Sequence, residues 1–303
     1  APLLDGFQSR LLDAYGTQVI HQAWKPVTVF LNGQYWGHMN LRERVDRFFI
    51  AQFEGLPLDQ ADEMDILEAN GTVNFGSNKA YRAMLKKIKA GSPATNPDDL
   101  QYILDNVDVD NLFEYMALEM FVGNSDIGNI RYYRLHQEGS KWKWIWYDAD
   151  YGLYSSKFNS PWSYLKVKGM GEQKIDNTIF LKLLEHPDYK RKFLEKLADV
   201  YKTFTTEYMT QVLDGVLAEI QPEMKNHWER WGELNDKAVT SEVPTTIDGA
   251  YTYWESRVNR LYNTLKVRPH RLWDFIKDEF KLTKTEMEEL FGPQPDYPDD
   301  AVL

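Results

Sequence analysis

The clearest pattern in the chain is an alternation of apolar and polar residues that predicts a β-hairpin near its start. The alternation runs through 27–31 and 34–41, on either side of Asn32-Gly33. This dipeptide favours the positive φ angles of a type I′ turn, which joins two antiparallel strands. A helix over 45–54 and a short strand over 64–68 are predicted next. The segment 69–75 is expected to be a loop that acts as a hinge.

From Ser77 onward the apolar residues recur at helical spacing. Helices are predicted over 79–89, after Asn96 with Pro97 at the first helical position, and over 110–122. The last of these is apolar almost all round, so we expect it to run through the core of the molecule. Further helices are predicted over 177–186, 188–203, 206–220, 250–266 and 269–280, with a capping box at Thr283-x-x-Glu286 for a final one.

This succession of elements predicts an α+β chain with two lobes. Residues 1–75 form a small sheet-rich lobe and residues 76–292 a large helical lobe, while the Pro- and Asp-rich tail 293–303 is expected to be disordered. Residues 150–175 show no strong periodicity, and a loop of that length inside a domain usually carries function.

Oxygen-bearing side chains gather on both sides of one predicted hairpin, over 130–147. Asp126 and Asn129 precede its first strand, and Asp148 and Asp150 end its second. Because the chain reverses in a hairpin, both pairs are expected at the same end of the sheet. Two carboxylates about 5 Å apart repel by roughly 3 kcal/mol at an effective dielectric near 20, and a divalent cation would remove that cost.

The types of ligand atom in this cluster indicate which cation it would bind. Carboxylates and an amide oxygen suit Mg²⁺, Mn²⁺ or Ca²⁺, whereas zinc usually recruits Cys or His. The chain has no Cys, and its six His are scattered without ligand spacing. A plainer reading stays open, since Asp and Asn are also common turn and cap formers. On that reading the four residues are only a helix exit and strand-end charges.

Composition narrows the classes of function. A chain of 303 residues with 43% apolar and 27% charged residues is typical of a folded protein, and its formal charge of −11 argues against a nucleic-acid binder. Disulfides and thiol catalysis are excluded because there is no Cys. No apolar run is long enough for a membrane span, and phosphate-binding loop and serine-hydrolase motifs do not occur.

Four blocks of the sequence stand in an order that is typical of one protein family. They read PVxVFLNGxYWG at 26–37, LRER at 41–44, GNSDxxNIRYYR at 123–134 and KWKWIxYDxDYG at 141–152. Together they resemble the CotH kinase family, the spore coat protein H-like atypical protein kinases. The resemblance covers about residues 1–290.

The resemblance implies a divergent protein-kinase-like fold that transfers the γ-phosphoryl group of ATP to Ser or Thr with Mg²⁺ or Mn²⁺. By the family pattern, Asp126 orients the acceptor hydroxyl, while Asn129 and Asp148 hold metal with Asp150 close by. Such chemistry rests on positioning and on neutralising phosphate charge, which agrees with the oxygen cluster seen in the sequence.

Three further residues are candidates for binding the nucleotide. Arg131 and Arg134 alternate with tyrosines on a predicted strand, and Glu43 lies between two arginines. Arg131 and Arg134 are predicted to contact phosphate, and Glu43 is predicted to align a nucleotide-binding lysine. The alternatives are a solvated strand face for the arginines and a surface ion pair for Glu43.

The resemblance also suggests where the protein acts. We expect a bacterial protein, secreted or at the cell surface, whose acceptor is a surface or coat protein. The family carries strands upstream of the block near Leu3, so the small lobe is expected to be truncated at its N-terminal side. Two rival functions stay open: a non-catalytic relative that binds polysaccharide or protein through its 14% aromatic residues, and a metal-dependent phosphoester hydrolase.

Overall fold

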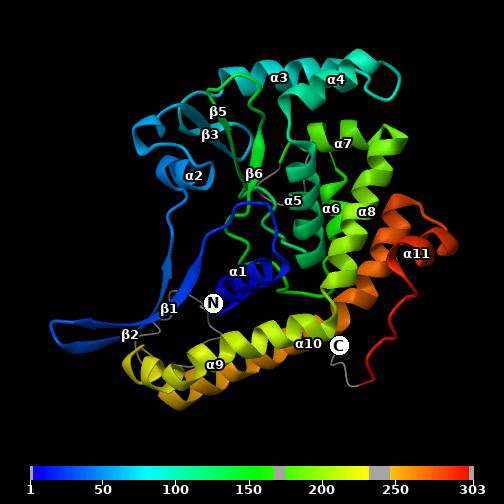
Figure 1. The fold of residues 1–303 in the computed structure, drawn as a ribbon. Helices are drawn as coiled ribbons and strands as arrows, with labels where there is room; N and C mark the ends of the chain where they lie inside the picture. The colour runs from blue at the N-terminus through cyan, green and yellow to red at the C-terminus, as the bar shows by residue number, and fades with distance from the viewer. Residues whose placement is uncertain (1–2, 167–174, 232–245, 300–303) are drawn as a thin grey trace.

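The computed structural model of the chain describes residues 3–166, 175–231 and 246–299 and shows an α+β fold (Figure 1). Small antiparallel sheets lie in the N-terminal half, and the C-terminal half is mainly helical. The strands are β1 (Trp24–Leu31), β2 (Gln34–Arg42), β3 (Met64–Glu68), β4 (Thr72–Phe75), β5 (Arg131–Leu135) and β6 (Lys143–Ile145). The helices are α1 (Leu4–Tyr15), α2 (Arg47–Phe53), the 3₁₀ turn η1 (Leu58–Gln60), α3 (Lys79–Ala90), α4 (Pro97–Asn106), α5 (Val109–Val122), α6 (Ser160–Tyr164), α7 (Thr178–Leu184), α8 (Pro187–Thr203), α9 (Thr206–Trp231), α10 (Ile247–Phe280) and α11 (Lys284–Phe291).

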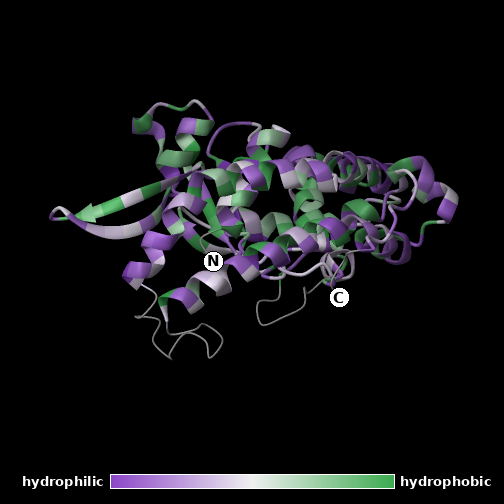
Figure 2. Cartoon of the chain, turned by 90° about the horizontal axis from the view of Figure 1, so that it is seen from below, coloured by the Kyte–Doolittle hydropathy of each residue, from purple (hydrophilic) through white to green (hydrophobic). Residues whose placement is uncertain are grey.

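The first hairpin is confirmed. Strands β1 and β2 pair antiparallel around Asn32 and Gly33, whose φ angles of 51° and 79° are the left-handed values that this turn requires. The hairpin projects from the body of the molecule (Figure 2) and carries exposed apolar side chains, with Phe30 and Leu41 each 60% exposed.

A second sheet has the strand order β4-β3-β5-β6, and all of its pairings are antiparallel. The expectation that 69–75 is only a loop is wrong, because residues 72–75 form the edge strand β4. Strand β3 pairs with β5 rather than with the first hairpin, so this sheet joins both sides of the predicted lobe boundary after residue 75. Short local patterns could not show this pairing, since it depends on contacts between distant segments. The division into lobes stays a prediction.

The two faces of this sheet belong to different cores. Ile66, Tyr133 and Ile145 point to a small apolar cluster that includes buried residues of α2. Their neighbours Tyr132 and Trp144 point to the large core of the molecule. Each strand alternates between the two clusters, as the period of two in a β-strand requires.

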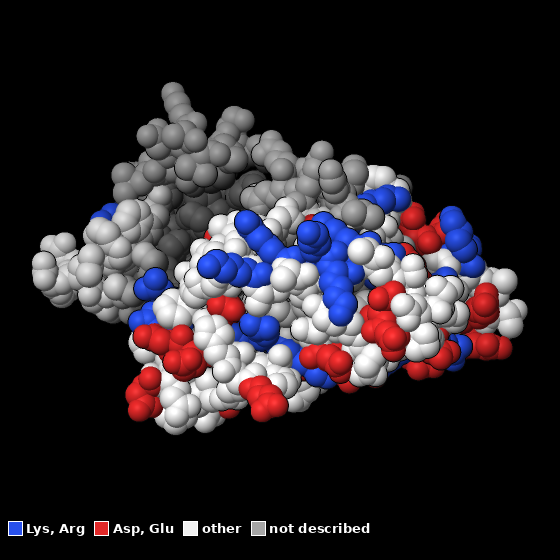
Figure 3. Space-filling model, turned by 90° about the horizontal axis from the view of Figure 1, so that it is seen from above, with Lys and Arg blue, Asp and Glu red and all other residues white. Residues whose placement is uncertain are grey.

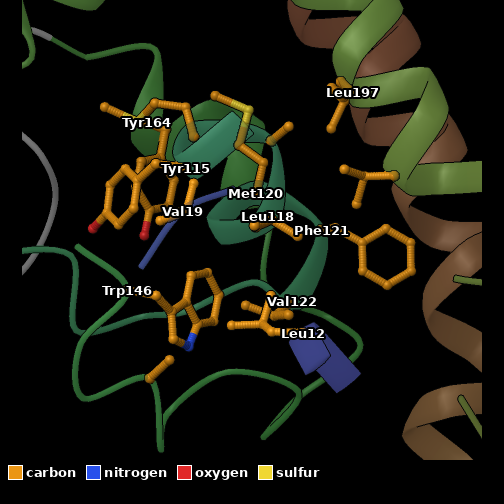
Figure 4. Close-up of a cluster of buried hydrophobic side chains, with 14 of the residues drawn as sticks. Leu12, Val19, Tyr115, Leu118, Met120, Phe121, Val122, Trp146, Tyr164 and Leu197 are labelled. Carbon is orange, nitrogen blue, oxygen red and sulfur yellow. The ribbon is translucent and has the colours of Figure 1, made fainter. Parts of the chain in front are cut away.

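Helix α5 runs through the large core, as its all-round apolar pattern predicted. Twelve of its fourteen residues are buried. Figure 4 shows its side chains packed among residues from distant parts of the chain. Leu12 comes from α1, Tyr164 from α6 and Leu197 from α8, while Trp146 follows β6. The C-terminal end of this helix is therefore fixed in position before the chain enters the loop 123–130.

The long helices α9 and α10 lie side by side along the lower edge of the molecule (Figure 1). Two separate helices over 250–266 and 269–280 were expected, but α10 is continuous through Pro269. A proline deprives the carbonyl four residues earlier of its amide donor. Here Thr206 Oγ1 donates to the Leu265 carbonyl at 3.2 Å, so the helix continues without an unsatisfied group. Helix α9 also extends beyond its predicted end at 220.

Residues 293–299 have no helix or strand. The Pro295 carbonyl lies 2.7 Å from His270 Nδ1 on α10, and the Tyr297 ring packs edge-on against His270. The predicted disorder of 293–303 stays a prediction, and residues 300–303 lie outside the described residues. The capping box of Thr283 and Glu286 is confirmed at the start of α11.

The segment 150–175 also differs from its expectation as a loop, because α6 interrupts it; residues 167–174 fall outside the described part. None of the helices in the described ranges combines the length and the apolar character that a membrane span would need.

Candidate active site

The loop that follows α5 is held by its own hydrogen bonds. Gly123 ends the helix with a left-handed φ of 64°, and its amide donates to the Glu119 carbonyl at 2.9 Å. The buried Asn124 side chain accepts from the Asp126 amide at 3.1 Å, and the Asn129 amide donates to the Asp126 carbonyl at 3.2 Å. The loop thus turns back on itself, which sets Asp126 and Asn129 on a fixed backbone.

The hairpin β5–β6 brings the two predicted pairs to one place. Asn129 Nδ2 donates to Asp148 Oδ2 at 2.5 Å. Asp148 has a φ of 50°, a left-handed value that is uncommon for a residue other than Gly. Strand β6 ends at Ile145, so Asp148 lies in the segment that follows the strand and does not end the strand itself, contrary to the prediction. Backbone strain of this kind is concentrated at functional sites.

The carboxylates of this site act on one another. Burial raises the pKa of Asp126, and the charge of Asp148 raises it further, against a hydrogen bond from Asn129. Burial also raises the pKa of Asp150, again with the charge of Asp148 as the next cause. All four side chains are only half-buried, so they are accessible to a ligand. The arrangement places like charges together at an accessible site.

The residues present suit a hard divalent cation that is shared with a ligand. Among residues 3–166, 175–231 and 246–299, no three His, Cys, Asp or Glu side chains lie close enough to hold a metal by themselves. Mg²⁺ is usually bound by one or two carboxylates together with water and substrate phosphates, rather than by a cage of protein ligands. Asp148 and the Asn129 amide oxygen are donors of that kind.

Arg42, at the end of β2, is a site residue that the sequence analysis did not select. Its guanidinium forms an ion pair with Asp5 and donates to the Gln22 side chain at 2.8 Å. Burial lowers its pKa, while the charges of Asp148 and Asp150 oppose this change. The Leu41-Arg-Glu-Arg block was the available signal, but the pattern alone did not tell which of its residues faces the site.

Helix α1 fixes the segment after Asp148. Gln8 is buried, and its Nε2 donates to the carbonyls of Ala149 at 2.6 Å and Gly152 at 3.0 Å. A Cβ at Gly152 would lie 2.9 Å from the Gln8 amide group and 3.0 Å from the Ala149 carbonyl oxygen, so a larger residue there would displace the Gln8 side chain. The position of Asp150 between these two anchored residues follows from this clamp.

Behind the loop lies a buried acid, Glu119, which the sequence analysis also missed. Tyr164 Oη donates to Glu119 Oε2 at 2.8 Å. Burial raises the Glu119 pKa to about 7, partly offset by the Tyr164 hydrogen bond and slightly increased by the charge of Asp126. Helix α5 also contains Asp110 and Glu114, so the sequence held no signal that distinguishes Glu119 from an ordinary helical acid.

The C-terminal end of α5 is also tied to α10 through Arg268, which is completely buried. Its guanidinium donates to the carbonyls of Met120 at 2.8 Å, Phe121 at 2.9 Å and Phe158 at 2.6 Å. Burial lowers the Arg268 pKa to about 9, so the side chain is still a cation at neutral pH. A cation at this end of a helix is favourable because the helix dipole is negative there.

The other predicted nucleotide-binding residues take up different positions. Glu43 accepts from the Ala23 amide at 2.9 Å, and among the described residues it forms no ion pair with a lysine. Arg131 donates to the Val45 carbonyl at 2.8 Å and stacks over Tyr147. Arg134 pairs with Asp65.

The register of β5 separates the two arginines. They are three residues apart, so Arg131 shares the face of Tyr133 and Arg134 that of Tyr132. The structure therefore does not bring them together on one ligand. Their roles, and that of Glu43, stay predictions.

The negative net charge is not evenly spread. Seen from above, basic side chains gather over the region of α3 (Figure 3). The exposed basic residues of this helix are Lys79, Arg82, Lys86, Lys87 and Lys89. The formal charge of −11 therefore does not describe every face of the molecule.

Comparison with known families supplies an independent finding. The sequence model of the family described as CotH kinase protein matches residues 4–272, which include the site and most of the chain. Comparison with the curated proteins gives no match.

Proposed function

Because the chain belongs to the CotH kinase protein family, we propose that it is a protein kinase that transfers the γ-phosphoryl group of ATP to Ser or Thr of a surface or coat protein. A kinase implies a nucleotide as ligand. The acceptor class and the need for Mg²⁺ or Mn²⁺ are part of the proposal.

The observation that carries this proposal is the contact of Asn129 with Asp148 beside Asp126 and Asp150. Phosphoryl transfer needs little covalent help from a protein, but it needs divalent charge between the phosphates and a group that orients the acceptor. The site offers both kinds of residue within one accessible cluster.

Each residue has a distinct role in this proposal. Asp148 and Asn129 would hold the cation, which would neutralise charge on the phosphate oxygens. Asp126 accepts a hydrogen bond from the acceptor hydroxyl and takes its proton as the hydroxyl oxygen bonds to the γ-phosphorus. The bond from the γ-phosphorus to the bridging oxygen breaks in the same transfer, and ADP leaves. The raised pKa of Asp126 suits this role, because a carboxylate with a higher pKa is a stronger base.

One observation favours a second candidate. Tyr151 and Tyr154, directly after the carboxylates, are 52% and 40% exposed, and their ring centroids lie 6.2 Å apart. Exposed aromatic pairs can stack on sugar rings or on a partner protein. A non-catalytic relative that binds polysaccharide would use this surface without nucleotide.

The proposal is tested by incubating the chain with ATP labelled at the γ-phosphate, Mg²⁺ and a Ser/Thr-rich acceptor protein. A kinase places label on the acceptor, and chelation of the metal abolishes this transfer. Label that appears only as free phosphate would instead indicate a hydrolase with water as acceptor. Polysaccharide binding that persists under chelation, without any transfer, would favour the second candidate.

A further inference from the structure

The segment that follows the carboxylates is packed against two arginines of α10. The Tyr154 ring lies beneath both guanidinium groups, with Arg257 at 5.0 Å and Arg260 at 4.9 Å from its centroid. Two cations are thus held on one aromatic ring, although like charges repel.

A groove of about 490 Å³ opens beside this ring. Its lining contains hydroxyl, amide and cationic groups and no carboxylate. The lining residues are Tyr154, Ser155, Ser156, Lys157, Asn259, Arg260, Asn263 and Thr264. Arg257 lines the adjoining apolar pocket, which also contains no carboxylate among its lining residues. In a chain with 46 acidic residues and 35 basic ones, such a surface is unusual.

The cations of the groove have no acidic partners within the described ranges of the chain. Neither Arg257, Arg260 nor Lys157 forms an ion pair there, whereas Arg191 on α8 pairs with Glu195 at 2.7 Å. Arg260 and Lys157 are exposed and Arg257 is half-buried, so an anion can reach all three. Arginine pairs favour phosphate because a guanidinium donates two parallel hydrogen bonds to its oxygens.

We propose that this groove binds a phosphate monoester that the acceptor protein already carries, so that the preferred substrate is a segment phosphorylated close to the next acceptor hydroxyl. Arg257, Arg260 and Lys157 contact the phosphate oxygens, and the serine hydroxyls donate beside them. Ser155 itself is engaged in the turn of this segment, where its Oγ accepts from the Lys157 amide at 3.2 Å. The phosphate is therefore expected on the acceptor protein rather than on Ser155 itself.

The distance from the groove to the carboxylates limits how far the bound phosphate can be from the acceptor hydroxyl along the acceptor segment. Ser155 is five positions after Asp150 along the chain, so this edge of the groove lies within roughly 18 Å of the Asp150 backbone. An extended acceptor segment covers that span in about five residues. This inference rests on the proposed kinase function, and it predicts that one phosphate directs the next to within about five residues.

The test compares two synthetic Ser-rich peptides that differ by one phosphoserine. Binding is measured by fluorescence anisotropy without nucleotide, so that catalysis is not needed. The phosphorylated peptide is expected to bind at least tenfold more tightly, and Arg257→Gln with Arg260→Gln should remove most of this preference. The pair Arg257→Lys and Arg260→Lys keeps the charge and should keep part of the preference. Arg191→Gln, on the surface of α8, is the matched control and should change nothing.

Melting curves of every variant establish that each is folded. Equal binding of both peptides, or an unchanged preference in the folded glutamine variant, would overturn the inference. Transfer with equal kcat/KM to both peptides would also overturn it and leave the kinase function standing. A preference that depends on the arginines, without any transfer in the presence of Mg²⁺ and ATP, would support the groove and contradict the kinase function. Inorganic phosphate is the competing probe, and it should displace the phosphorylated peptide alone.

Discussion

At the scale of single residues, the site depends on carboxylates that repel one another while an amide links them. Asn129 holds Asp148 by a 2.5 Å hydrogen bond, and the charge of Asp148 helps to raise the pKa of both Asp126 and Asp150. The repulsion between these carboxylates is unfavourable, and a bound cation would relieve it.

The first prediction concerns Asp148. Asp148→Asn removes the negative charge closest to Asn129, so metal-dependent nucleotide affinity should fall by about tenfold or more. Isothermal titration with Mg²⁺ and ATP measures the change. Asp110→Asn is the control, because Asp110 is an exposed carboxylate at the start of α5. Equal affinity in the Asp148 variant and the parent would show that Asp148 does not hold the metal.

A second prediction concerns Glu119, whose folded-state pKa is raised by burial from 4.5 to about 7. Between pH 4.5 and about 7, the folded chain therefore keeps the Glu119 proton while the unfolded chain releases it. The stability that the neutral Glu119 side chain contributes is fully present below pH 4.5. It is lost as the pH rises through about 7.

Glu119→Gln should therefore flatten the fall in melting temperature between pH 5 and pH 8, and should raise the melting temperature at pH 8. Each kcal/mol corresponds to about 1.6 °C for a chain of 303 residues, at an unfolding entropy of about 2.1 cal/mol/K per residue. Thermal unfolding at several pH values measures this. Parallel curves for the variant and the parent would contradict the buried, proton-linked acid.

At the scale of elements, the candidate site is held by helices from the N-terminal and the C-terminal parts of the chain. Helix α1 holds residues 149–152 through Gln8, and α10 holds the end of α5 through Arg268. Neither helix contains a residue that the sequence pattern marked as functional. The geometry of the carboxylate site therefore depends on Gln8 and Arg268, two positioning residues that the sequence pattern did not mark.

A third prediction follows for α1. Gln8→Ala removes the side-chain donor from the carbonyls of Ala149 and Gly152. The Ala149 carbonyl keeps the Gly152 amide as a donor at 2.7 Å, so the loss should cost about 1–2 kcal/mol of unfolding free energy. Nucleotide affinity should fall as well, because Asp150 lies between the two residues that Gln8 holds. Gln101→Ala on the exposed surface of α4 is the control, with denaturant unfolding as the measurement. A variant as stable as the parent would show that the clamp contributes nothing.

Local signals predicted those elements that local residues determine. Asn32-Gly33 fixed the first hairpin by its φ preference, and Asn96 with Pro97 fixed the start of α4. Pro269 predicted a helix end that does not occur, because Thr206, a residue more than sixty positions away, donates to the carbonyl that the proline leaves without an amide. Strand β4 was missed because four residues give too little alternation, and its pairing with β3 alone defines it.

The same difference between local signals and distant contacts explains which site residues could be predicted. Asp126, Asn129, Asp148 and Asp150 could be predicted because they flank one hairpin, and a hairpin brings its flanks together. Arg42 and Gln8 could not be selected, since each reaches the site through contacts between distant parts of the chain. Glu119 required knowledge of burial, because only burial distinguishes it from an ordinary helical acid.

At the scale of the whole molecule, ligand binding should be visible as added stability. A fourth prediction is that Mg²⁺ with ATP raises the melting temperature by several degrees, because a ligand at about 100 times its dissociation constant adds roughly 2.7 kcal/mol. Differential scanning fluorimetry with ATP alone, metal alone and both together measures it. The shift should require both, and a shift with ATP alone would contradict a shared metal.

The central claim is that Asp126 directs phosphoryl transfer at a metal–nucleotide site. The most direct test measures the rate at which phosphate from ATP is incorporated into an acceptor protein at saturating Mg²⁺ and ATP, for the parent and for Asp126→Asn. Removal of a general base typically costs a factor of about 10² to 10⁴. The account predicts a loss of that size, with nucleotide affinity almost unchanged because Asp126 does not hold the cation. Equal rates of incorporation in the two proteins, or no incorporation by the folded, nucleotide-bound parent, would contradict it.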